Sequence, residues 1–274
     1  MNVKIYIVYF LLLFPVISFS QKAKHEIKVD SLEIVLKNEN LSADEKIVIF
    51  RRLCDYLRFQ DDKKHKRYLD SLIYTAKKID FDKYKGILSR YKAGYYNSIS
   101  EYNLAEQHYR DAIKEFYKKG KLKIAHNNLR YLSKVQRKLG KLEEAMETIM
   151  QVINEKDSLG LEDNIFAKDY SQIGSIHSTL DNFELSNEYF KKAEKIYISE
   201  NKKSSLAGIR QNLGINYVAL KQYDKALNFF EQSIEYYEKT KRYFSLASLY
   251  TSVGNIKLRQ DSIILSRKYF QKSL

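Results

Sequence analysis

The chain has 274 residues, of which 44% are hydrophobic and 30% charged, and a formal net charge of +14; this balance is typical of a globular protein and not of a disordered one. The single cysteine excludes an internal disulfide framework and a cysteine-rich zinc module. With 9 glycines and 1 proline, the sequence also lacks the turn residues that a large all-β protein needs, so an all-α fold is expected.

The first twenty residues have the pattern of a secretory signal peptide. Lys4 is their only charge, Ile5 to Ile17 form an apolar run, and Ser18 and Ser20 are the small residues that precede a cleavage site. We expect this signal to be removed during export to the periplasm or cell surface, and an uncleaved anchor is the alternative. The style of the signal and the richness in Lys, Asn, Ile and Tyr indicate a bacterial protein. No second apolar stretch of membrane-spanning length follows.

The segment after the signal leads into the first helical pair. Residues 21–41 are expected to form a lead segment with a short helix near residues 31–37. Ser42 and Glu45 have the spacing of a capping box, which predicts that a helix begins there. Residues 61–80 are expected to form the second helix of this pair.

Small residues then recur about every 40 positions along the chain. Gly174, Gly214 and Gly254 are each 40 residues apart. Twelve residues after Gly214 comes Ala226, and four further on comes Phe230, a small–large spacing that recurs in the other copies. Because close helices need a small side chain on one partner and a ring on the other, we interpret these three residues as the contact points of a helical hairpin. Turns are expected at the glycines between helices, which are Gly120, Gly140 and Gly160.

The copy from Ala207 to Thr240 resembles a tetratricopeptide repeat. It carries the residues of that pattern at Leu213, Gly214, Tyr217, Ala226 and Phe230. The usual Trp is missing, and Glu238 stands where the family has the helix-ending Pro. Without this Pro the second helix can continue for another turn, which accounts for a period of 40 residues.

This resemblance implies an all-α, right-handed α-solenoid of about six helical hairpins. The repeats are expected at about residues 42–80, 81–120, 121–160, 161–200, 201–240 and 241–274. A long helical bundle or a coiled coil is the alternative, but a coiled coil does not explain small residues that recur at 40. Since the last repeat has no polar cap, we expect either that the chain is part of a longer protein or that a partner covers this end.

The sequence contains no arrangement of residues that indicates catalysis. Neither a glycine-rich phosphate loop nor an HExxH zinc motif occurs, and the five histidines are too scattered for metal ligands. Cys54 is interpreted as a buried core residue and His177 as a histidine packed between helices. We therefore expect no enzyme activity, no metal and no cofactor.

The resemblance further implies that the first helices of the hairpins line a concave inner wall. The candidate groove residues there are Arg90, Asn127, Arg130, Lys134, Arg137, Gln172, Gln211 and Asn212. The groove would be cationic at one end and lined with amides at the other. We expect it to take an acidic or extended peptide, with Arg130, Lys134 and Arg137 pairing its carboxylates; a solvated face of a basic protein is the alternative interpretation.

Two classes of function follow from these expectations. The first is an exported scaffold or adaptor that binds a protein or peptide partner. The second, implied by the resemblance, is the periplasmic sensory ectodomain of a membrane-anchored regulator, either a histidine kinase or a DNA-binding transcriptional regulator. Nucleic acid is not expected as a partner, because the signal directs export and no stacking platform is visible.

Overall fold

The computed structural model describes residues 21–161 and 163–273. The predicted signal peptide at residues 1–20 lies outside the described residues. The helices in chain order are α2 (Gln21–Leu36), α3 (Ala43–Leu57), α4 (Asp62–Ile79), α5 (Phe81–Ser98), α6 (Tyr102–Lys118), α7 (Leu122–Lys138), α8 (Leu142–Ser158), the 3₁₀ helix η1 (Asp163–Phe166), α9 (Ala167–Thr179), α10 (Phe183–Ser199), α11 (Lys203–Ala219), α12 (Tyr223–Lys239), α13 (Tyr243–Arg259) and α14 (Ile263–Lys272).

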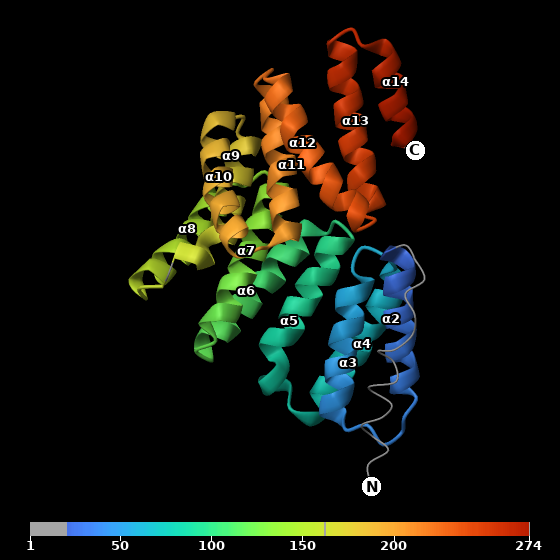
Figure 1. Ribbon diagram of the computed structural model, residues 1–274. Coiled ribbons are helices and arrows are strands. Elements are labelled where there is room, and N and C mark those ends of the chain that lie inside the picture. The colour runs from blue at the N-terminus through green and yellow to red at the C-terminus, as the bar shows by residue number, and fades with distance from the viewer. Residues whose placement is uncertain (1–20, 162, 274) are drawn as a thin grey trace.

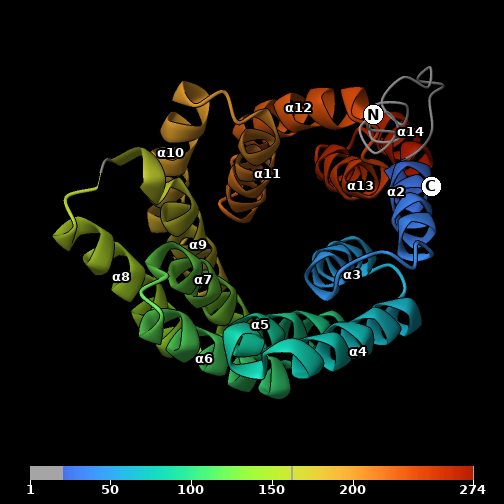
Figure 2. The same cartoon turned by 90° about the horizontal axis from the view of Figure 1, so that it is seen from below.

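From α3 onward, the described helices pair into six consecutive hairpins, from α3–α4 to α13–α14. Figure 1 shows the hairpins stacked side by side, and Figure 2 shows that they curve into a wide arc. The first helix of each hairpin lies on the inner side of the arc and the second on the outer side (Figure 2). In Figure 1 the last hairpin is displaced along the axis of the arc from the first one, so the arc is a superhelix and not a closed ring. The predicted all-α solenoid is confirmed.

The lead segment differs from its prediction. Helix α2 runs from Gln21 to Leu36, whereas a short helix near residues 31–37 was expected. No Pro or Gly interrupts these residues, and Val29 is buried in a cluster with Leu32 and Leu36 at its edge. Packing against the first hairpin therefore supports a helix of four turns, although its amphipathic pattern is weak.

The predicted capping box is present at the start of α3. The Ser42 hydroxyl accepts a hydrogen bond from the Glu45 backbone N–H at 3.3 Å. In return, the Glu45 carboxylate accepts from the Ser42 backbone N–H at 2.9 Å. These two bonds satisfy two N–H groups that would otherwise have no partner at the start of the helix.

The glycine turns adopt the left-handed backbone conformation that ends a helix. Gly120, Gly140 and Gly160 have φ values of 64°, 76° and 61°. At the first of them, the N–H of Lys121 donates to the carbonyl of Phe116 at 2.9 Å and the N–H of Gly120 to that of Tyr117 at 2.9 Å. This is the Schellman pattern, which satisfies the last backbone carbonyls of α6. The next helix, α7, begins without a side-chain cap.

The 40-residue glycine column marks the closest approach of the two helices in a hairpin. A Cβ atom added to Gly174 would lie 2.7 Å from the Phe190 ring, and one added to Gly254 would lie 2.7 Å from the Phe270 ring. The same addition at Gly214 would overlap the Phe230 ring even more closely. The predicted contact of small residue and ring is confirmed in these hairpins.

The core continues from hairpin to hairpin along the arc. One buried cluster joins α2 to α5, a second extends from α5 to α9, and a third extends from α9 to α13. Among the described helices, none is both long enough and apolar enough to cross a membrane.

Candidate functional site

A pocket lies on the inner wall where α7, α9 and α11 stand side by side. Its volume is about 630 Å³. It is lined by Asn127, Arg130, Tyr131, Lys134, Arg137, Lys168, Ser171, Gln172, Ser175, Tyr197, Ser205, Gly208, Ile209, Gln211 and Asn212. We call this site the inner-wall pocket. Among the described residues, the lining of the pocket contains four basic side chains and no acidic one.

The repeat itself brings these residues together. The step from the third copy to the fourth is 41 residues and the next step is 40, so equivalent positions form columns across the three helices. One column runs through Asn127, Lys168 and Gly208, a second through Arg130, Ser171 and Gln211, and a third through Tyr131, Gln172 and Asn212. Because stacked repeats place equivalent positions next to each other, each column crosses the wall as a continuous strip.

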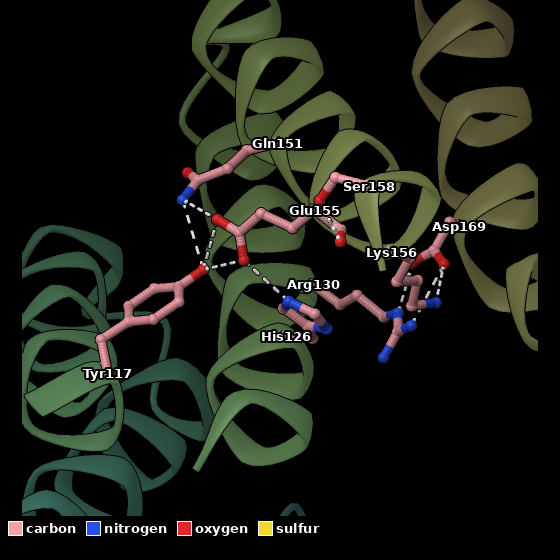
Figure 3. A network of polar contacts seen from close by, with 8 residues as sticks. All are labelled: Tyr117, His126, Arg130, Gln151, Glu155, Lys156, Ser158 and Asp169. Atoms are coloured by element: carbon pink, nitrogen blue, oxygen red, sulfur yellow. Dashed lines mark hydrogen bonds and ion pairs between the residues drawn. The ribbon is translucent and has the colours of Figure 1, made fainter. Parts of the chain in front are cut away.

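Arg130 is held by a carboxylate inside the protein. Its Nε lies 2.5 Å from Oδ1 of Asp169, and its Nη2 donates to Oδ2 at 3.1 Å. The Asp169 side chain is fully buried and that of Arg130 is 13% exposed. Asp169 also accepts a hydrogen bond from Nζ of Lys156, whose side chain is 3% exposed. Figure 3 shows Asp169 facing both cations.

This cluster of Arg130, Lys156 and Asp169 fastens the third repeat to the fourth. Asp169 lies in the first turn of α9, where the helix dipole also favours a negative charge. Lys156 further donates to the backbone carbonyl of Ile165 at 2.9 Å and lies 5.0 Å from the centre of the Phe166 ring. Burial lowers the pKa of Lys156. The cluster thus secures η1 and the start of α9 behind the pocket.

The neighbouring residue on α8 secures the preceding repeat. Glu155 accepts hydrogen bonds from the Tyr117 hydroxyl at 2.7 Å and from the Gln151 amide at 2.7 Å, and lies 2.8 Å from Nε2 of His126 (Figure 3). Tyr117 comes from α6 and His126 from α7, so this network joins the second and third hairpins. Glu155 thus connects α8 to α6 and α7, and Lys156 connects it to α9.

Lys134 and Lys168 carry positive charge without a partner carboxylate. In the described part of the chain, neither side chain forms an ion pair, whereas Arg130 and Lys156 share Asp169. Both lysines are exposed to the hollow of the pocket. The pKa of Lys134 is lowered by desolvation and then by the positive charges of Arg137 and Lys168. These cations therefore crowd one end of the pocket.

Two side chains of the lining have buried donors that lack an acceptor. Gln172 is 4% exposed, and its Nε2 has no hydrogen-bond partner among the described residues. Nε of Arg137 is buried and unpartnered as well, although Nη1 donates to the Thr179 hydroxyl at 3.2 Å. Burial lowers the pKa of Arg137. An unsatisfied buried donor costs free energy, so an occupant that accepts hydrogen bonds is favoured here.

The opposite end of the pocket is neutral and has open space. Gln211 and Asn212 present amides there, and the Tyr237 hydroxyl lies 3.4 Å from Oε1 of Gln211. A Cβ added to Gly208 would have only the Tyr237 hydroxyl nearby, at 3.9 Å. Gly208 therefore leaves the pocket open but is not needed for helix packing.

Residues 167–239, which form α9 to α12, match the family model of the tetratricopeptide repeat. This match identifies the two hairpins from α9 to α12. Residues 167–239 are tetratricopeptide repeats. No curated protein matches the sequence significantly.

Solved structures with the same fold share little sequence with this chain. A Rap protein complexed with competence and sporulation factor has a TM-score of 0.73 and 14% identity over 88% of this chain and 67% of its own. NprR in complex with its cognate peptide NprX has a TM-score of 0.67 and 18% identity over 90% of this chain and 70% of its own. A signal-transduction ATPase with a tetratricopeptide-repeat sensor, from Pyrococcus horikoshii, has a TM-score of 0.64 and 15% identity. The match covers 92% of our chain but only 39% of the ATPase.

The stack of hairpins gathers seven of the eight candidate groove residues at the inner-wall pocket. Arg90 is not among the lining residues; its guanidinium lies 5.3 Å from the centre of the Tyr91 ring on α5. Arg130 reaches the pocket, but its carboxylate partner is Asp169 of the protein itself, a contact that the sequence analysis did not anticipate. That these residues bind a ligand stays a prediction.

Sequence reasoning missed Lys168, Gly208 and Tyr197 in the pocket lining. A signal was available for the first two, because they follow Asn127 in the same repeat column at steps of 41 and 40. Tyr197 comes from the end of the outer helix α10 and is 6% exposed. No column of first-helix residues could have identified it.

The other residues singled out in the sequence have structural roles. Cys54 is fully buried, and burial raises the pKa of its thiol to about 12. His177 is partly buried and stacks on Tyr189 at a centroid distance of 5.7 Å, between the two helices of its repeat. In the described part of the chain, no group of three or more His, Cys, Asp or Glu side chains is placed to hold a metal ion.

Proposed function

We propose that this protein is an exported scaffold that binds an extended segment of a partner protein, or a peptide, in the inner-wall pocket. The observation that carries the proposal is the pocket itself, a hollow in which side chains of three consecutive repeats present amides, hydroxyls and cations. Solenoids use concave surfaces of this kind for binding. Extended peptides need such donors and acceptors along their length because their own backbone groups are unpaired.

Two structural neighbours support a peptide or protein as the occupant. NprR was solved with its cognate peptide, and the Rap protein with competence and sporulation factor. Both share the fold of this chain at 18% and 14% identity. Because fold does not fix function, the occupant here has to be tested directly.

Blocking the pocket tests this proposal. Gly208→Leu places a side chain in the hollow at a position where packing leaves room. Ser248→Leu is the matched control, since Ser248 occupies the same repeat position 40 residues later, is exposed, and lies outside the lining. Peptides selected from a random dodecapeptide library on the unmodified protein should bind Gly208→Leu about tenfold more weakly or worse, and Ser248→Leu as before.

Two results would contradict the proposal. One is equal binding of the selected peptides to both variants, which would place their site elsewhere on the protein. The other is a failure to select any peptide.

Export is a separate part of the proposal and rests on the pattern of Met1 to Ser20. Its test is the N-terminal sequence of the protein purified from its host. A mature chain that begins at Gln21 supports export with cleavage, whereas an intact Met1 in the cytoplasmic fraction contradicts it.

A sensory ectodomain is the second candidate function. It is favoured by the similarity in fold to a signal-transduction ATPase whose tetratricopeptide repeats serve as its sensor. In this role the same pocket would bind the signal. Sequencing the gene beyond codon 274 distinguishes the two roles, because a sensor requires a following membrane-spanning segment and an output domain.

A further inference from the structure

Two neighbouring turns on one edge of the solenoid carry a dense group of lysines. The turns join α4 to α5 and α6 to α7, and both lie along the lower edge of the arc in Figure 1. Six lysines at these turns are exposed and form no ion pair with a described residue; they are Lys77, Lys78, Lys118, Lys119, Lys121 and Lys123. We call the surface formed by these six residues the lysine edge.

Contacts between α5 and α6 make the lysine edge one continuous surface. Nζ of Lys119, directly after α6, donates to the backbone carbonyls of Asp82 and Lys83 in the first turn of α5, at 2.5 and 3.2 Å. Nearby, Lys85 of α5 pairs with Glu115 of α6 at 3.1 Å. The end of α6 therefore lies against the start of α5, and the lysines of the two turns are neighbours.

The carboxylates around the lysine edge leave most of its charge uncompensated. Asp44 pairs at 3.1 Å with Lys83, which is not one of the six lysines. The Asp80 carboxylate accepts the backbone N–H of Lys83 at 2.9 Å as the N-cap of α5. Asp82 adds one further exposed negative charge. The six lysines thus retain an excess of positive charge over Asp80 and Asp82.

The other dense basic run of the sequence, at the start of α4, is paired within the protein. Lys64 and Arg67 lie 3.5 and 3.6 Å from the carboxylate of Glu33. Lys66 lies 2.6 Å from the carboxylate of Asp70. Among the first three hairpins, the lysine edge is therefore the outer surface whose positive charge is left for an external partner.

Exposed apolar side chains stand among the lysines. Phe81 and Leu122, the first residues of α5 and α7, are 43% and 38% exposed, and Ile79 is 40% exposed. Phe81 and Leu122 are equivalent positions of successive repeats, 41 residues apart. Lysines and apolar side chains together suit the boundary between lipid headgroups and acyl chains. Single-stranded nucleic acid instead needs rings that stack on bases, which Ile79 and Leu122 do not supply.

We propose that the lysine edge docks on the surface of an anionic phospholipid bilayer. The lysine ammonium groups pair with headgroup phosphates, and each basic residue close to such a surface adds to the attraction. Phe81 and Leu122 enter the boundary with the acyl chains and add apolar burial. The lysine edge contains none of the residues that line the inner-wall pocket, so this proposal does not depend on what that pocket binds.

Vesicle sedimentation tests the docking. The chain beginning at Gln21, which contains every described helix, is mixed with vesicles of phosphatidylcholine alone or with about 30% phosphatidylglycerol. At about 0.1 M salt, the partition coefficient should be at least about tenfold higher for the anionic vesicles, and it should fall as salt is added. Equal binding to both kinds of vesicle would overturn the proposal.

Lysine variants test where the membrane binds. Lys118→Gln/Lys121→Gln/Lys123→Gln should weaken binding to anionic vesicles by about tenfold or more. The matched control, Lys191→Gln/Lys195→Gln/Lys268→Gln, removes the same charge from exposed positions of α10 and α14 and should have little effect. If both triple variants bind equally weakly, net charge alone attracts the protein and the lysine edge is not the docking surface.

Apolar variants distinguish a bilayer from other polyanions. Phe81→Ser/Leu122→Ser should weaken vesicle binding by about fivefold or more, because the apolar side chains no longer enter the boundary. Leu180→Ser/Leu185→Ser is the control, since these residues have similar exposures of 44% and 39% and lie at the turn between α9 and α10. Circular dichroism checks that each variant is folded. Unchanged vesicle binding by Phe81→Ser/Leu122→Ser would show that the lysines attract polyanions in general, and the lipid assignment would fail.

Discussion

At the scale of single residues, the same amino acid has opposite roles at two positions of the repeat. Gly214 lies against the Phe230 ring, where no side chain fits, and Gly208 borders an open pocket. Both are in α11, six residues apart, so local helix propensity cannot distinguish them. The difference comes only from what each glycine faces across the fold.

Substitution of these two glycines by alanine should therefore have opposite effects on stability. Gly214→Ala forces the Phe230 ring to move and should lower the free energy of unfolding by about 1–3 kcal/mol. Gly208→Ala adds a better helix former without a clash and should raise it by up to about 1 kcal/mol. Urea unfolding of both variants checks this, and a destabilised Gly208→Ala would disagree with the open space seen at that position.

His65 makes stability depend on pH. Its side chain is fully buried on α4, neither ring nitrogen has a partner among the described residues, and the ring lies edge-on to Tyr95. Burial and the positive charge of Arg58 lower the pKa of His65 to about 4, against the opposing effect of Asp62 and Asp55. Because the unfolded chain takes up a proton below about pH 6.5 and the folded chain does not, acid favours unfolding.

As the pH is lowered from 6.5 to 4, protonation of His65 in the unfolded chain should by itself reduce the free energy of unfolding by about 1.4 kcal/mol for each pH unit. Between pH 7 and pH 5, His65→Leu should lose about 2 kcal/mol less than the unmodified protein. Urea titrations at the two pH values measure this difference. The same loss in both proteins would mean that His65 becomes protonated in the folded state.

At the scale of elements, buried charges connect the third and fourth repeats. Helix α8 contacts α9 less extensively than the paired helices contact each other, and η1 lies in this connection. The ion pairs of Asp169 with Arg130 and Lys156 join α7, α8 and α9 at this point. They also support the wall from which Lys134 and Lys168 reach the pocket.

Removing the charge of Asp169 should be far more costly than removing that of a surface carboxylate. Asp169→Asn leaves Lys156 buried without a counter-charge and should lower the free energy of unfolding by about 3–5 kcal/mol. Asp70→Asn, which breaks the exposed pair with Lys66, should cost at most about 1 kcal/mol. Similar thermal shifts for the two variants would show that the buried cluster does not hold the repeats together.

At the scale of the whole molecule, stability should vary along the solenoid, because each repeat contacts mainly its neighbours. Helix α10 packs against both α9 and α11, whereas α14 packs chiefly against α13. Helix α14 also leaves Ile263, Ile264 and Leu265 exposed. The hairpin α13–α14 therefore buries less apolar surface than the hairpins before it, although ordering its residues costs a similar amount of conformational entropy.

Hydrogen exchange should show this gradient directly. Backbone amides of α14 should exchange at least about tenfold faster than those of α10, since among the described helices α14 packs chiefly against α13, whereas α10 packs against two neighbours. Mass spectrometry of peptic fragments measures both helices in one experiment. Equal protection of the two would indicate that another surface covers α14 in solution.

The repeat architecture follows from the sequence alone, because its determinants are local or periodic. The Ser42–Glu45 capping box, the left-handed glycines such as Gly140, and the Gly–Phe pairs at 40-residue spacing all act within one hairpin. A short-range pattern of this kind specifies helix, turn and partner helix. Repetition then builds the arc, so the inner wall and seven of its candidate residues could be identified without coordinates.

Only the tertiary structure decided which of those residues are available to a ligand. Arg130 and Lys134 have the same charge and lie on one stripe of α7. Arg130 forms an ion pair with Asp169, whereas Lys134 forms no ion pair with a described carboxylate. Likewise, the length of α2 depended on packing against the first hairpin and not on its own weak pattern. Charge pairing and burial depend on contacts between repeats, and a periodic sequence does not specify how these contacts are distributed.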